Sequence, residues 1–193
     1  MSQYFTGRGD DGTTGLLGEG RVPKDDLQIE LLGTLDETSA ALGLARATCK
    51  AERIAKLILQ IQRDLYLMMA EVAATPENVE IFQHIDDVKV AWVEDAIEKF
   101  GKLVKMPKEF LVPGDSQGEA ALAMARTIVR RAERRAVELY RGQKISNPHI
   151  LVYLNRVSSL VFLLELFEHF SMKRTGPTLA KIKKEDEHDR NIA

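Results

Sequence analysis

Six arginines lie between residues 125 and 141, in the stretch ARTIVRRAERRAVELYR, and guanidinium groups at this density can bind phosphates or carboxylates. Small and apolar residues recur there every three or four positions: Leu122, Ala125, Val129, Ala132, Ala136 and Leu139. This spacing predicts a helix with one buried seam. The arginines must therefore be sorted by their direction around that helix.

At about 100° per residue, the inner set beside the seam is Arg126, Arg130, Glu133 and Arg134, and the outer set is Arg131, Arg135 and Glu138. A guanidinium that borders buried surface is costly unless an anion pairs with it, so the inner set predicts anionic partners. The outer set predicts an ordinary salt-bridged surface turned toward water. Structural ion pairs alone are the alternative for both sets.

The amino-terminal segment holds six of the thirteen glycines, at positions 7, 9, 12, 15, 18 and 20. Glycine lets backbone N–H groups approach a ligand closely. The segment also has hydroxyl and cationic side chains that can bind phosphates: Thr6, Thr13, Thr14, Arg8 and Lys24. Together these groups are typical of a polyphosphate site. No Gly-Lys-Ser/Thr ends the segment and no strand precedes it, which excludes a Walker loop and a dinucleotide fingerprint. A flexible glycine-rich tail explains the spacing equally well.

Composition limits the classes of protein and partner. The chain has 193 residues, 45% of them hydrophobic, and a net charge of −2, so no global electrostatic attraction to nucleic acid is expected. A single cysteine cannot form an internal disulfide, and neither a leader segment nor an apolar run near membrane-spanning length is apparent. We expect a cytoplasmic protein without a membrane partner. The four histidines show no metal-ligand spacing, so no metal site built from the chain's own residues is predicted.

The elements that position these residues are predicted from six prolines and helical periodicity. The predicted helices cover about 25–48, 51–74, a third starting at the acidic pair 86–87, a fourth from about 116 and a fifth from the SNP of 146–148. No segment shows convincing strand alternation. We therefore predict an all-α, five-helix up-and-down bundle forming one domain over 1–193, with a glycine-rich loop at 1–24, the bundle at 25–173 and a charged, flexible tail at 174–193.

The first predicted helix carries a second stripe beside its main seam, made of Leu32, Asp36, Ser39 and Gly43. Small residues on this stripe would let another helix approach closely, as inside a bundle or at a subunit contact. Asp36 then becomes a candidate partner for an inner arginine. The alternative is that Asp36 is simply exposed.

Taken together, four blocks resemble the PduO-type ATP:cob(I)alamin adenosyltransferases: YFTGRGDDGTTGLLGEGRVPKDD, GTLDETSAALG, EFLVPGDSQGEAALAMARTIVRRAERR and YLNRVSSLVF. The resemblance runs from about residue 4 to 170, and the blocks stand in the family's order. The chain departs from the family in having PGD where PGG is usual at 113–115, and Ala123 where a histidine is usual.

The resemblance implies a homotrimer of five-helix subunits with an active site at each subunit interface, using ATP with Mg²⁺ and taking cobalamin as substrate. It implies that the nucleotide is held by Thr6, Gly7, Arg8, Gly9, Thr14, Gly15, Lys24, Arg130, Arg131, Glu133, Arg134 and Asn155. It further implies that Asp36 of one subunit pairs with Arg130 of the next beside the corrinoid. Phe110 resembles the aromatic that displaces the lower axial ligand of cobalt.

The partners implied by the resemblance are adenosylcobalamin-dependent enzymes, which take up the product, and a cobalamin reductase. Two alternatives keep the fold without the reaction. One is an ATP- or adenosylcobalamin-binding regulatory or delivery protein, and the other is a trimeric helical scaffold whose arginine–aspartate pairs serve assembly alone. The scaffold gives no reason for a lysine and threonines to accompany the glycines.

Overall fold

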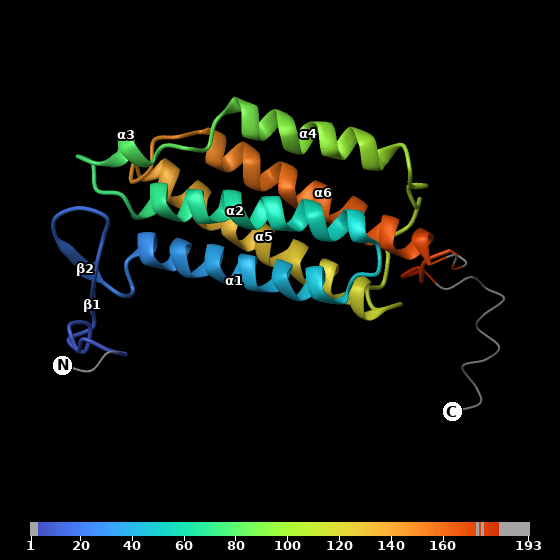
Figure 1. Ribbon diagram of the computed structural model, residues 1–193, viewed down its shortest axis with the longest axis horizontal. Coiled ribbons are helices and arrows are strands. Elements are labelled where there is room, and N and C mark those ends of the chain that lie inside the picture. The colour runs from blue at the N-terminus through green and yellow to red at the C-terminus, as the bar shows by residue number, and fades with distance from the viewer. Residues whose placement is uncertain (1–3, 173, 175, 182–193) are drawn as a thin grey trace.

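The computed structural model describes residues 4–172, 174 and 176–181, and its architecture is a bundle of five long helices with a small β-hairpin at one end (Figure 1). The elements are β1 (Thr13–Gly15), β2 (Arg21–Pro23), α1 (Leu27–Thr48), α2 (Glu52–Ala73), α3 (Val79–Phe82), α4 (Asp87–Gly101), α5 (Gln117–Arg141) and α6 (His149–Ser171). The five predicted helices are confirmed as α1, α2, α4, α5 and α6. The single turn α3 was not predicted.

Three of the long helices begin at side chains that accept a hydrogen bond from the first turn. The caps are Asp26, which accepts from the N–H of Gln28, Asp86, which accepts from Lys89, and Ser116, which accepts from Glu119. These caps satisfy donors that have no partner within the helix. The Ser116 cap fixes the residue at which α5, the arginine helix, begins.

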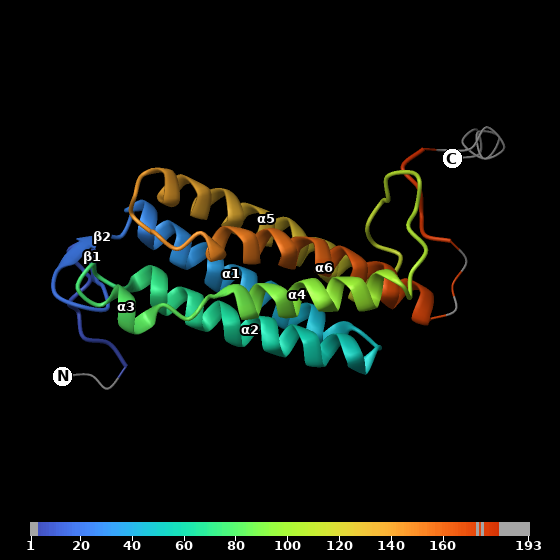
Figure 2. The same cartoon turned by 90° about the horizontal axis from the view of Figure 1, so that it is seen from above.

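The helices pack in the order α2, α1, α5, α6, α4, with α1 against both α2 and α5, and α6 against both α5 and α4 (Figures 1 and 2). The core is drawn from all five, and the seam predicted for the arginine helix is buried as expected. Because α5 lies between α1 and α6, it presents one edge to each neighbour. This placement separates the two sets of arginines.

Helix α6 corrects one expectation from the sequence. By length and composition α6 could cross a membrane. The prediction that the chain has no apolar run near membrane-spanning length is therefore wrong. In the structure 61% of its most apolar window is buried inside the bundle. A helix that packs on α5 and α4 at once needs apolar residues on most of its circumference, which is the property of a core helix.

The all-α prediction fails in the glycine-rich segment. There β1 and β2 pair antiparallel, with Thr14 opposite Val22. The hairpin turn is fastened to the end of α2, because the N–H of Leu17 donates to Ala73 O at 2.8 Å and the N–H of Thr75 donates to Leu17 O at 3.2 Å. At Gly18 the φ is +151°, and an added Cβ would lie 1.9 Å from Thr75 Oγ1. Only glycine fits this contact.

Candidate active site

A groove of about 660 Å³ runs along the surface shared by α5, α6 and the connection between α4 and α5. One wall is the segment 106–113, which includes Phe110, and the other is formed by side chains of the two helices. The Phe110 side chain is 87% exposed, so its ring projects from the wall and little packing covers it. An exposed aromatic beside a groove is typical of a surface that receives a partner or ligand.

A smaller cleft of about 290 Å³ continues along the same two helices and is lined by Arg130, Glu133, Arg134, Val137 and Asn155. Asn155 Nδ2 donates to Glu133 Oε1 at 2.9 Å, which holds this carboxylate in the cleft that the two arginines line. Arg130 lines both the groove and the cleft. The structure thus brings three of the four site residues predicted on α5, Arg130, Glu133 and Arg134, together with Asn155 on α6. Arg130 also lines the groove that contains Phe110.

Arg130 and Arg134 are exposed, and no carboxylate pairs with either within the part of the chain that the structure describes. Arg134 Nη1 donates to the carbonyl oxygen of Arg130 at 3.1 Å. Two cations that form no ion pair with a described residue line one cleft, and the Glu133 carboxylate lines it with them. Such an arrangement suits a polyanionic ligand.

The outer arginines lie on the opposite edge of α5 and form ion pairs with α1. Arg131 pairs with Glu37, and Arg135 pairs with Glu30 at 3.5 Å and with Glu138 at 3.1 Å. These pairs confirm that the outer set is salt-bridged, with partners on α1 and on α5 itself. The predicted directions are wrong, because Arg131 and Arg135 are half-buried against α1 whereas Arg130 and Arg134 are exposed. Arg131, which the resemblance places at the nucleotide, is therefore not in the cleft with Arg130 and Arg134.

The predicted nucleotide-loop residues gather around the β-hairpin, at the end of the bundle where α5 ends (Figure 2). The hairpin is held by Arg21, whose Nε donates to Thr13 Oγ1 at 2.8 Å and whose Nη2 donates to Arg8 O at 2.6 Å. Gly9 approaches Lys24 so closely that an added Cβ would lie 3.1 Å from Nζ. Among the described residues, no hydrogen bond or ion pair joins this hairpin to Arg130 or Arg134.

Asp36 is exposed on α1, which was the alternative to its pairing with an inner arginine. The small residues of its stripe are used partly within the subunit, because Gln62 of α2 donates to Ser39 O at 2.9 Å and lies against Gly43. Asp36 itself forms no ion pair with another described residue. The structure therefore leaves this carboxylate on the surface, where a second subunit could reach it.

Sequence reasoning missed a buried carboxylate in the groove, Glu165. It lines the groove beside Arg126, whose Nε is buried without a hydrogen-bond partner among the described residues. The sequence could have indicated this buried carboxylate, because Glu165 interrupts the apolar run LVFLLEL. Burial raises the pKa of Glu165 to about 7; Arg126 opposes this shift, and the charges of Glu119 and Asp115 add to it.

The raised pKa of Glu165 predicts a pH-dependent stability. Because the folded state binds this proton more tightly than the unfolded chain, stability falls as pH rises from about 4.5 to about 7. We expect Glu165→Gln, which mimics the protonated form, to raise Tm at pH 8 and to change it little at pH 5. In a chain of this size about 1 kcal/mol corresponds to about 2–4 °C. Glu98→Gln, on the exposed face of α4, is the matched control, and an equal gain from both variants at pH 8 would contradict the role of burial.

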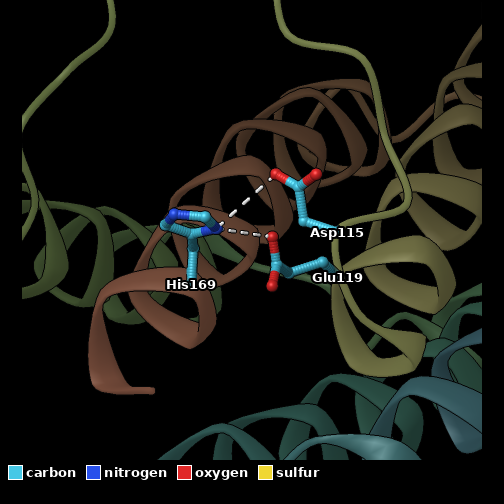
Figure 3. Close-up of side chains that lie close together, drawn as sticks. All are labelled: Asp115, Glu119 and His169. Atoms are coloured by element: carbon cyan, nitrogen blue, oxygen red, sulfur yellow. Dashed lines mark hydrogen bonds and ion pairs between the residues drawn. The ribbon is translucent and has the colours of Figure 1, made fainter. Parts of the chain in front are cut away.

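A second group that the sequence did not predict is formed by Asp115, Glu119 and His169 (Figure 3). His169 is buried in the last turn of α6, and its Nδ1 lies 2.9 Å from Glu119 Oε2 and 3.8 Å from Asp115 Oδ2. Their ligand atoms all lie within 4.8 Å of one another, so the group could hold a metal ion by distance. Arg174 lies 3.9 Å from Glu119 Oε1, so an arginine already supplies positive charge at this place.

Comparison with known proteins shows which family the chain resembles. Residues 4–168 match the family model described as cobalamin adenosyltransferase. The chain is 36% identical to a corrinoid adenosyltransferase of Bacillus subtilis, with 83% of each chain covered, and 30% identical to one of Citrobacter freundii, with 87% and 96% covered. It is 38% identical to the corrinoid adenosyltransferase PduO of Citrobacter freundii over 83% of this chain, but spans only 48% of that relative.

Solved structures show the same fold. A variant PduO-type ATP:corrinoid adenosyltransferase from Lactobacillus reuteri, complexed with cobalamin and ATP, superposes with a TM-score of 0.85 at 27% identity, covering 93% of this chain and all of that one. Another variant of that enzyme, complexed with ATP, gives a TM-score of 0.84 at 26% identity. Because the family model covers residues 4–168 and relatives 30% or more identical cover 83% to 87% of the chain, the chain belongs to the cobalamin adenosyltransferase family, as an ATP:corrinoid adenosyltransferase.

Proposed function

We propose that the groove and the cleft on α5 and α6 are two halves of one active site, with cobalamin in the groove and the phosphates of ATP in the cleft. The observation that carries this assignment is the position of Arg130, which lines both. The groove offers an apolar wall and an exposed aromatic ring for a large planar ligand, whereas the cleft offers guanidinium groups for a polyanion.

The reaction requires cob(I)alamin to attack C5′ of ATP. The electron pair of Co(I) forms the Co–C bond, the C5′–O bond breaks, and triphosphate leaves with that bonding pair. No side chain has to act as a nucleophile or general base. The protein must hold C5′ in line with cobalt and stabilise negative charge on the leaving group. Arg130 and Arg134 fit the second task because both line the cleft and neither forms an ion pair with a described residue.

The hairpin supplies the remaining phosphate contacts in this proposal, through Thr6, Gly7, Arg8, Gly9, Thr14, Gly15 and Lys24. Several of its glycines adopt positive φ, including Gly7 at +70°, which exposes successive N–H groups to a ligand. Mg²⁺ would accompany the triphosphate as its counter-ion. The carboxylate that lines the cleft, Glu133, is an oxygen donor of the kind that this ion prefers.

We further propose that the active molecule is a homotrimer in which Asp36 of one subunit pairs with Arg130 of its neighbour. The support is a matched pair of surfaces: an exposed carboxylate on α1 and exposed arginines on α5, neither paired within the described chain. A partner subunit would complete both. The adenosylcobalamin formed there would pass to adenosylcobalamin-dependent enzymes, and a cobalamin reductase would supply the reduced corrinoid, in the cytoplasm.

Mixed trimers test whether each site is shared between subunits. Asp36→Ala and Arg134→Ala should each be inactive alone, but refolded together they should regain activity, because about a quarter of the sites then combine two intact surfaces. The measurement is Co–C bond formation from ATP and chemically reduced cobalamin, followed in the visible spectrum.

The control mixture combines Arg130→Ala with Arg134→Ala. Both changes lie on the same helix, so every hybrid site keeps one defect and no recovery is expected. If mass spectrometry shows mixed trimers but the Asp36 mixture stays inactive, Asp36 does not contribute to a shared site.

A further inference from the structure

The backbone that carries Phe110 is held by the carboxy-terminal segment. Residues 176–181, predicted to belong to a flexible tail, run antiparallel to the connection between α4 and α5, as Figure 2 shows at the end of the bundle opposite the hairpin. The N–H of Val112 donates to Thr178 O at 2.9 Å, and the N–H of Ala180 donates to Phe110 O at 2.8 Å. Residues 182–193 lie outside the described residues.

This pairing is important because little else holds the ring-bearing residue. Residues 102–116 contain no helix or strand of their own, and the Phe110 ring is 87% exposed. Side-chain packing therefore contributes little to the direction of the ring. Its position depends on backbone hydrogen bonds that a neighbouring segment provides, and that segment is itself short.

Asp115 fastens the carboxy-terminal segment at one residue through two contacts. Its Oδ2 accepts from the N–H of Thr178 at 2.9 Å, and its Oδ1 accepts from Thr178 Oγ1 at 2.6 Å. These bonds favour the ionised carboxylate, and the hydroxyl contact is the largest cause of the lowered pKa of Asp115. Asp115 directly precedes the cap Ser116, so the clamp is fixed to the start of α5.

A second set of contacts ties the same place to both helices. Arg174 donates to the carbonyl oxygen of Asp115, and its guanidinium lies near Glu119, which in turn contacts His169. Glu119 belongs to the first turn of α5 and His169 to the last turn of α6. The segment that holds the Phe110 backbone is thus anchored on the two helices that form the groove.

From this arrangement we propose that Asp115 is a positioning residue for the groove: by holding Thr178 it keeps the carboxy-terminal segment paired with the Phe110 backbone, and so sets the direction of the Phe110 ring. The inference rests on the proposed role of Phe110 at cobalt. Asp115 lines neither the groove nor the cleft, so the proposed role acts only through the segment that it holds.

The test compares Asp115→Ala with Asp115→Asn. Alanine removes both contacts, whereas asparagine can keep both, because its Oδ1 can accept from the N–H of Thr178 and its amide can donate to the hydroxyl. In the alanine variant, amide exchange at Val112 and Ala180 should accelerate. Adenosylation that starts from Co(II) with a reductant should fall about tenfold or more, as expected for a displaced contact. Adenosylation that starts from chemically reduced Co(I) should stay within about twofold.

Asparagine should restore protected exchange and most of the Co(II)-dependent rate. Thr178→Ala, which removes one contact at a distance from the start of α5, should show the same selective loss if Asp115→Ala fails to fold. Asp95→Ala on α4, which loses only a surface ion pair with Lys99, should leave both rates unchanged. Equal loss of both rates, or faster exchange without any loss from Co(II), would overturn the proposal.

Phe110→Ala measured in parallel separates this inference from the function on which it rests. If Phe110→Ala lacks the selective loss from Co(II), the role of the ring at cobalt is wrong. If Phe110→Ala shows the loss and the alanine variant of Asp115 does not, only the positioning role of Asp115 is wrong.

Discussion

Arg130→Ala and Arg134→Ala are each expected to lower adenosylation by a factor on the order of 10²–10³, the usual cost of removing one group that stabilises charge in a transition state. Both guanidinium groups line the cleft, and neither pairs with a described carboxylate of its own subunit. Arg134 is therefore available to the triphosphate, and Arg130 is placed to contact both the triphosphate and the proposed Asp36 of the neighbour. The helix should persist, because both side chains are exposed. Turnover with Mg-ATP and cob(I)alamin, together with far-UV circular dichroism, measures the two effects.

Arg135→Ala is the matched control on the same helix. It removes surface pairs with Glu30 and Glu138, which contribute little to stability, and it does not touch the cleft. Its activity should stay within about twofold of the unchanged protein. Equal loss from Arg130, Arg134 and Arg135 variants with intact helicity would mean that direction around α5 does not decide function.

Phe110→Ala should lower the rate of adenosylation from Co(II) on the order of tenfold or more and leave the rate from chemically reduced Co(I) nearly unchanged. An aromatic ring that removes the lower axial donor raises the Co(II)/Co(I) potential, because axial ligands set redox potential. A shift of about 59 mV changes a one-electron equilibrium tenfold. Starting from Co(I) bypasses that step.

The electron paramagnetic resonance spectrum of bound Co(II) provides an independent measurement, since Phe110→Ala should lose the four-coordinate signal. Leu103→Ala removes another exposed apolar side chain from the same connection, outside the groove, and should change neither rate nor spectrum. If Phe110→Ala depresses both assays equally, the ring only packs against the corrinoid and does not act on its axial ligand.

The sequence determined the helices and the family. The periodicity of small and apolar residues predicted all five long helices, and it divided the arginines into two sets that the structure keeps apart. These predictions succeed because a helix buries one face and because residues three and four apart share that face. The periodicity did not predict the exposure of the arginines, because Arg130 and Arg134 are exposed and Arg131 and Arg135 are half-buried. The combination of four motifs in order indicated the chemistry, which the comparisons then established.

Three features came only from the tertiary structure. The glycine-rich segment forms a hairpin because its turn bonds to the end of α2, a contact that its own residues do not predict. Glu165 has a raised pKa because the fold buries it near Glu119 and Asp115. Arg131 turns to α1 because Glu37 lies there. Each depends on residues distant in sequence, whose proximity follows from how the helices pack.

The carboxy-terminal segment shows most clearly that contacts between distant residues cannot be predicted from local sequence. Its mixed charges predicted a flexible tail, and local composition supports that expectation. Thr178 lies 63 positions after Asp115 and is nevertheless hydrogen-bonded to it, so residues 176–181 run beside the Phe110 backbone. Local sequence determines which stretches can become helices, because helical hydrogen bonds join near neighbours. Only the packed bundle decides which loop lies beside which segment, because those hydrogen bonds join residues that the helices bring together.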